Sequence, residues 1–156
     1  MANLTVHRKE MMHVTANDLD VFLSGHLHDV RMPGRKPSRE AARAMLAGVD
    51  MPRSVDLEQY LVTYGQLALG TVQMYGMDGS GASDMRDATE RLRRDFCMTD
   101  GYAALEALDG GRFALCDGHG RVFRFDPQAR ELTDLRMQLW EYILGRFRGE
   151  LPEDAT

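Results

Sequence analysis

The sequence contains few cysteines and few lysines, and it has no long hydrophobic run. Its 156 residues include only Cys97 and Cys116, too few for a disulfide framework and too far apart for a CxxC motif. No apolar stretch approaches the roughly 20 residues that a membrane-spanning helix needs. The first ten residues contain charged side chains and lack the apolar centre of a signal peptide. We therefore expect a cytoplasmic protein with free thiols and no membrane association.

Basic charge is scarce relative to acidic charge. The chain has 19 basic and 24 acidic residues, a net charge of −5. Surfaces that bind nucleic acid or anionic membranes normally carry an excess of basic residues, so the composition argues against both as partners. A hydrophobic share of 44% and a charged share of 28% are typical of a globular protein, and this length suffices for one domain with its own core.

The first half of the chain has the patterns of helices separated by loops. Thr15 and Asp18 predict a capped helix start, with apolar residues at helical spacing as far as Leu27. Further helices are predicted over 39–47, after Ser38, and from near Ser54 to Gly65. The two prolines and the glycine of 31–37 predict a loop or linker. This organisation suggests three parts: an N-terminal helical extension at 1–37, a main domain at 38–151 and an acidic tail at 152–156.

The second half of the chain predicts mainly strands. Glycines among β-prone residues over 66–76 predict a strand bent at Gly70, followed by a helix over 85–96 that buries Phe96. Strands are then predicted at 102–108, 112–117 and 121–126, the last two as an antiparallel hairpin, and 72–75 is expected to belong to the same central sheet. Apolar three- and four-residue steps predict a final helix over 132–147 that packs on the sheet and buries Leu139 and Ile143. The fold class is therefore α+β, with an antiparallel-rich central sheet flanked by helices.

No group of residues has the spacing of a catalytic or metal site. His26 and His28 lack further ligands at a recognisable spacing, which favours helix-terminal roles for both. The polar loop at 78–84 fits neither a calcium-binding nor a phosphate-binding loop, and Ser80 lacks the spacing of a nucleophile elbow. We interpret the arginines of 91–94 and 146–148 as solvated helix faces, and both thiols as buried and inert. These readings predict no enzymatic activity, no cofactor and no metal.

Turn and core residues from Met51 onward follow a recognisable order. Met51-Pro52 opens a helix that carries aromatic residues and ends at Gly65, and the next strand ends at Tyr75-Gly76. A strand then runs into the glycine turn at 109–111. An aspartate, a small turn, Gly-Arg-Val and two aromatic residues follow within 116–126, before the predicted closing helix.

In this order the segment 51–151 resembles the SUKH superfamily, a group of bacterial toxin-immunity proteins that also includes a yeast cell-wall synthesis regulator. Met51 stands where the family usually has leucine, and residues 1–37 have no counterpart in it. The resemblance implies an immunity protein that binds a cognate polymorphic toxin and neutralises it by occluding the toxin's active site. Two other readings remain open: a non-enzymatic regulatory or scaffold module, and a small enzyme or ligand-binding protein with an unrecognised site.

Acidic residues on predicted loops are the candidate contacts with such a toxin. Toxins that act on nucleic acid are expected to have basic clefts, which would attract an acidic inhibitor. The candidates are Asp78, Asp84, Asp109 and Asp117. Trp140 is a further candidate because it lies off the apolar stripe of its predicted helix, and tryptophan is enriched at the centres of interfaces.

Overall fold

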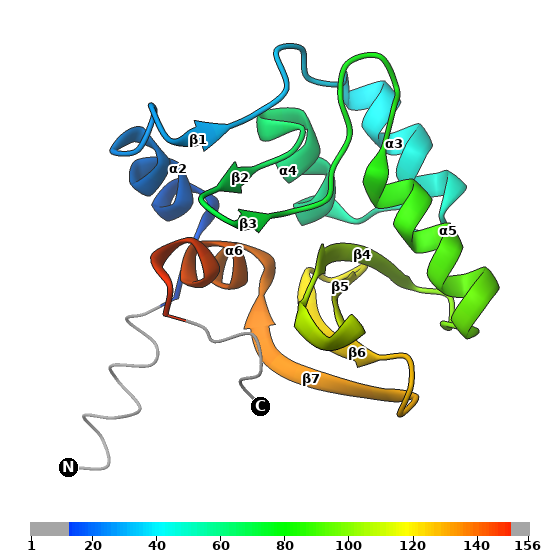
Figure 1. Ribbon diagram of the computed structural model, residues 1–156. Coiled ribbons are helices and arrows are strands. Elements are labelled where there is room, and N and C mark those ends of the chain that lie inside the picture. The colour runs from blue at the N-terminus through cyan, green and yellow to red at the C-terminus, as the bar shows by residue number, and fades with distance from the viewer. Residues whose placement is uncertain (1–12, 151–156) are drawn as a thin grey trace.

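Two antiparallel sheets and five helices make up residues 13–150, the part of the chain that the computed structural model describes (Figure 1). The helices are α2 (Ala16–Ser24), α3 (Arg39–Gly48), α4 (Val55–Tyr64), α5 (Asp84–Phe96) and α6 (Leu139–Arg148), with a short 3-10 turn at Asp109–Gly111. The small sheet contains β1 (Val30–Arg31), β2 (Ala68–Leu69) and β3 (Val72–Gln73), and the large sheet contains β4 (Tyr102–Ala107), β5 (Phe113–Asp117), β6 (Arg121–Asp126) and β7 (Glu131–Gln138). The predicted α+β fold class is confirmed.

Hydroxyl side chains cap the N-termini of three helices. Thr15 and Asp18 form a reciprocal capping box at α2, as predicted. The Ser38 hydroxyl accepts a hydrogen bond from an amide in the first turn of α3, and Ser83 does the same for α5. Helix α2 ends at Ser24, however, so the expectation that the helical stripe continues to Leu27 is wrong. After Gly25 the chain turns, and the Leu27 side chain is 67% exposed.

The region 66–76 forms a tight hairpin rather than the predicted bent strand. Leu69 pairs with Val72, and Gly70 adopts a left-handed conformation, with φ of 61°, in the turn between them. The residues of β3 therefore pair within the small sheet, where β2 also pairs with β1. The chain reaches the large sheet just after β3, where Met74 forms an isolated bridge with Glu106 and the Tyr75 amide donates to the Leu105 carbonyl oxygen at 2.7 Å. The prediction that 72–75 belongs to the central sheet is therefore wrong.

The predicted hairpin of the large sheet is confirmed. Strands β5 and β6 pair antiparallel, with Cys116 opposite Val122, and the sheet order is β4-β5-β6-β7. Gly120 at the hairpin tip has a φ of 80°, a left-handed conformation that favours glycine, and the Asp56 carboxylate lies where its Cβ atom would be. The tip therefore lies beside the first turn of α4.

The final helix is shorter than predicted, because 131–138 is a strand. Strand β7 pairs with β6 along its length, apart from an irregularity where Val122 pairs with Met137 and Phe123 with Asp134. At this irregularity Arg136 has a φ of 60° and its amide donates to the Asp134 carboxylate. The spacing of Leu132 and Leu135 matches a helix, but hydrogen-bonded pairing with β6 makes this segment a strand. Leu132 is 42% exposed as a result.

The helices bury both faces of the large sheet. On one face, Ala88 and Leu92 of α5 belong to a small cluster with Ala104, Leu115 and Phe125. The prediction that Phe96 also points inward is wrong, because its side chain is 42% exposed. The main core lies on the other side of the sheet and gathers residues from α2, α3, α4 and α6.

The described part of the N-terminal extension contributes to this main core. Leu19 and Leu23 of α2 are buried in it, and α2 packs against α6. Strand β1 adds an edge to the small sheet. The acidic tail at 152–156 lies outside the described residues.

The buried stripe of α6 is a test of this packing. Leu139 and Ile143 are fully buried, as predicted. We expect Leu139→Ala to lower the free energy of unfolding by about 2–5 kcal/mol, the usual range for truncating a core leucine. The exposed Leu132 is the matched control, and Leu132→Ala should cost less than about 1 kcal/mol. Equal losses for the two variants in urea denaturation would contradict the assignment of 131–138 to a strand.

Candidate interaction surface

Asp78 and Asp84 hold together the loop between β3 and α5. The Asp78 carboxylate accepts hydrogen bonds from the Ser80 amide at 2.8 Å and from its hydroxyl at 2.5 Å. These bonds hold the pKa of Asp78 below its usual value. The half-buried Asp84 accepts from the Gly76 amide and the Gln66 side chain, both at 2.8 Å, and burial raises its pKa. Both carboxylates therefore have structural partners in this loop.

Asp109 and Asp117 border opposite ends of β5. Asp109 lies in the exposed turn between β4 and β5, whereas Asp117 is the last residue of β5. A five-residue strand separates its ends by about 17 Å. Asp117 also accepts hydrogen bonds from the amides of His119 and Arg121, each at 2.9 Å. The predicted acidic residues are therefore distributed over several edges of the fold rather than gathered at one point.

Trp140 belongs to the main core, with only 7% of its surface exposed. Its accessible edge lines a pocket of about 280 Å³ together with Asp20 and Tyr64. The Tyr64 hydroxyl donates to the Asp20 carboxylate at 3.2 Å, which joins α4 to α2 beside the indole. Only this edge of the tryptophan is available to a partner.

Two arginines interpreted as solvated are instead tied into the fold. The Arg146 guanidinium forms a two-pronged ion pair with Glu106, with contacts of 3.0 Å from Nε to Oε1 and 2.6 Å from Nη2 to Oε2. The Tyr142 hydroxyl donates to the same carboxylate at 2.8 Å, and Glu106 is buried. Arg93 donates to the carbonyl oxygens of Val49 and Tyr102. The solvated interpretation is wrong for both arginines because each fills a site at which a strand and a helix meet.

The two thiols lie in different environments. Cys116 is fully buried in β5, and burial raises the pKa of its thiol well above the usual value. Cys97 is exposed in a left-handed conformation just after α5. The prediction of two buried thiols is therefore wrong for Cys97.

The histidines form no metal-ligand cluster among residues 13–150. The ring of His26 stacks on Phe22, and its Nδ1 lies 2.9 Å from the Phe22 carbonyl oxygen. His119 is exposed at the hairpin tip. Within the described residues, no three histidine, cysteine, aspartate or glutamate side chains lie close enough together to hold a metal ion.

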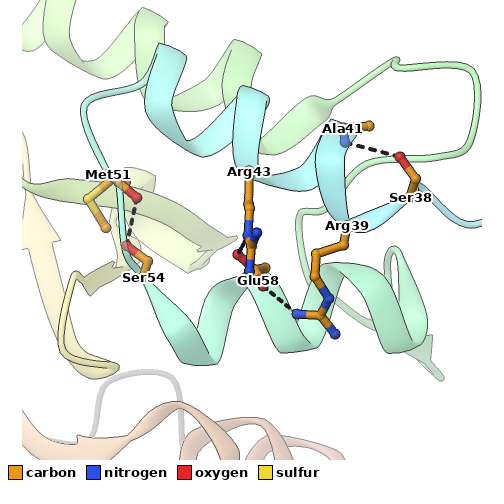
Figure 2. Close-up of polar contacts among 7 residues, drawn as sticks. All are labelled: Ser38, Arg39, Ala41, Arg43, Met51, Ser54 and Glu58. Atoms are coloured by element: carbon orange, nitrogen blue, oxygen red, sulfur yellow. Dashed lines mark hydrogen bonds and ion pairs between the residues drawn. The ribbon is translucent and has the colours of Figure 1, made fainter.

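A groove with a volume of about 610 Å³ lies between α3 and α4. Arg39 and Arg43 are four residues apart and therefore project from the same face of α3. Both guanidiniums reach the Glu58 carboxylate on α4 (Figure 2), with 2.7 Å between Arg43 Nε and Glu58 Oε1. These bonds hold the pKa of Glu58 below its usual value and raise that of Arg43. The ion pairs fix the two helices at one wall of the groove.

The turn between the two helices closes the groove. Asp50 and Arg53 both have left-handed backbone conformations, with φ of 59° and 65°, each at a cost of about 1 kcal/mol for an L-residue. The Ser54 hydroxyl donates to the Met51 carbonyl oxygen at 2.9 Å, closing the turn instead of capping α4 (Figure 2). Next to it, Val55 is 74% exposed at the start of α4. The turn therefore presents an arginine and a valine beside each other on the surface.

The groove has a mixed lining with a positive charge. Its charged residues are Arg39, Arg43, Arg53 and Glu58. Its apolar residues are Leu46, Ala47, Pro52 and Val55. Residues 31–53 carry six basic and two acidic side chains, a net charge of +4 in a chain with a net charge of −5. The rest of the chain therefore carries −9, and this segment is a basic region on an acidic protein.

The sequence interpretation missed this groove. The available signals were the four-residue spacing of Arg39 and Arg43 and the local excess of basic residues, which the net charge of the whole chain conceals. The contact of both arginines with Glu58 joins residues 15 and 19 positions apart, which no local pattern predicts.

No family model matches the chain, and neither does any curated protein. Among residues 13–150, no helix combines the length and apolar character needed to cross a bilayer.

The ion pair of Glu106 and Arg146 generates a stability prediction. We expect Arg146→Leu to lower the free energy of unfolding by about 3–5 kcal/mol, because it leaves a buried carboxylate without its cation. The exposed Arg94, whose guanidinium pairs with its neighbour Asp95, provides the control, and Arg94→Leu should cost less than about 1 kcal/mol. A loss of similar size for both variants in chemical denaturation would show that Glu106 does not depend on Arg146.

Thiol labelling distinguishes the two cysteines. A raised pKa leaves little thiolate at neutral pH, and burial blocks the reagent, so Cys116 should react with an aromatic disulfide reagent only after unfolding. Cys97 should react promptly in the folded protein. Cys97→Ser should abolish the prompt reaction and Cys116→Ser should leave it unchanged. Prompt labelling of the Cys97→Ser variant would contradict the placement of Cys116 in the core.

Proposed function

We propose that this protein is an immunity protein that binds a cognate polymorphic toxin and neutralises it by occluding the toxin's active site. The observation that carries the proposal is the α3–α4 groove, a concave and charged surface that ion pairs and a closed turn hold in one shape. Occlusion requires only a complementary surface of about 800 Å² on each partner, with no reacting groups. A preformed surface suits this task because little ordering accompanies binding.

The resemblance to the SUKH superfamily supports the same proposal. Its characteristic residues have clear structural roles in this fold. The Tyr60 hydroxyl donates to the Tyr75 carbonyl oxygen at 2.9 Å and accepts from the Leu67 amide at 3.3 Å, which fixes the small sheet on α4. Gly120 permits the hairpin tip to approach Asp56. Such residues build the scaffold and leave the surface to vary with the toxin that each protein meets.

The proposal places the protein in the cytoplasm, where a toxin that enters the cell, or is made there, finds its target. Its partner is then a protein rather than a nucleic acid or a membrane. The groove then contacts part of the toxin's surface, and this contact can be measured as binding, separately from growth.

Growth rescue combined with binding tests the proposal. We expect a toxin domain to be encoded beside this protein, its induced expression to arrest growth, and co-expression of this protein to restore growth. The two purified proteins should form a stable complex, and toxin activity should disappear at about one equivalent of inhibitor, as tight occlusion requires. A toxin with an unrelated catalytic domain is the control and should remain active. Rescue without a complex, or a complex with full toxin activity, would refute occlusion.

A further inference from the structure

We infer that the α3–α4 groove binds an acidic protein segment that carries a large apolar side chain. The inference rests on the proposed function only in taking the partner to be a protein. Its chemistry comes from the groove itself, in which three guanidinium groups and one carboxylate surround an apolar lining.

The arginines retain the capacity to bind carboxylates. A guanidinium carries five N–H donors, and Arg39 and Arg43 each use one of them in their bond to Glu58. Their side chains are 49% and 66% exposed, so both remain accessible to a ligand. Glu58 thus orients the two arginines without saturating them. An incoming carboxylate can bind beside Glu58 and leave the existing ion pairs intact.

Arg53 supplies a third positive charge to the lining of the groove. Among residues 13–150 it makes no hydrogen bond or ion pair, and its side chain is exposed. Arg53 has a left-handed backbone conformation, and both it and Val55, two residues further along the chain, line the groove. A ligand that contacts both residues therefore needs an anionic group and an apolar group close together.

The lining favours a protein segment over nucleic acid. Single-stranded nucleic acids are bound through base stacking on aromatic side chains as well as through phosphate contacts. Among the described residues the lining of the groove contains no aromatic side chain, and its apolar surface comes from Leu46, Ala47, Pro52 and Val55. Aliphatic surface of this kind accepts an aliphatic or aromatic side chain of a peptide. Charge complementarity then selects peptides rich in aspartate and glutamate.

The charge distribution of the whole chain strengthens this selection. The segment 31–53 carries a net charge of +4, whereas the remaining residues carry −9. This difference in net charge favours the approach of an acidic ligand to the segment that supplies the three arginines of the groove. Binding should therefore weaken as the salt concentration rises.

Peptide selection tests the inference without knowledge of the toxin. The full chain is used to select from a display library of random short peptides, and enriched sequences are synthesised for affinity measurements. We expect the enriched peptides to contain more acidic than basic residues and to share a large apolar residue.

Two variants with matched controls assign the binding to the groove. Arg53→Glu and Val55→Asp change exposed side chains and preserve the ion pairs of Glu58. The controls are Arg130→Glu, at an exposed arginine with a similar φ of 57°, and Val21→Asp, at a valine that is 64% exposed on α2. The groove variants should weaken peptide binding by about tenfold or more, and the controls should change it by less than about twofold.

Several results would overturn the inference. These are the absence of any enriched peptide, enrichment of neutral or basic peptides, and equal binding by groove and control variants. An oligonucleotide of equal charge that competes as well as the peptide would assign the groove to nucleic acid. Self-association that Arg53→Glu abolishes would assign it to a second copy of the chain. Each of these results leaves the outcome of the growth-rescue experiment unaffected, so failure of the inference is distinguishable from failure of the proposed function.

Discussion

The buried carboxylate of Glu106 is the point at which the parts of this fold are joined. Glu106 lies on β4, and its carboxylate accepts hydrogen bonds from the Arg146 guanidinium and the Tyr142 hydroxyl of α6. The backbone of Glu106 also forms a β-bridge with Met74, next to the small sheet. A charge buried in this way destabilises the fold unless its partners are all in place. The bonds from Tyr142 and Arg146 to Glu106 therefore fix the position of α6 relative to both sheets. Because α2 and α4 share the core with α6, the frame that carries the remaining helices depends on the same contact.

Glu58 has a comparable role at the surface, with a different consequence. Its ion pairs with Arg39 and Arg43 are accessible to water, so they contribute little to stability compared with the buried pair. They instead hold two positive groups at fixed positions beside an apolar lining. Because the core supplies the stability of the fold, this surface region need not contribute to it. Its charged and apolar side chains remain available for binding a partner. This division of roles agrees with a protein that acts by binding.

Local signals in the sequence predicted much of the fold. Hydroxyl caps at Thr15 and Ser38, the buried stripe of α4 and the glycine turn of the β5–β6 hairpin are encoded by neighbouring residues, and the structure confirms them. The prediction was wrong where distant contacts decide the conformation. The leucines of β7 have helical spacing, but pairing with β6 determines their structure. Arg146 looked solvated because its partner Glu106 is 40 residues away. The groove was not predicted for the same reason, because Arg39 and Arg43 on α3 bond to Glu58 on α4, which is 19 and 15 residues away.

The central claim is that recognition occurs at the basic groove rather than at the acidic loops. Amide chemical-shift mapping of the isotope-labelled chain, titrated with the toxin that it neutralises, tests this claim most directly. The account predicts that the largest shifts fall in α3, the turn at 49–54 and the first turns of α4. Largest shifts in the loop at 78–84 and at the two ends of β5, with little change between residues 39 and 58, would contradict it.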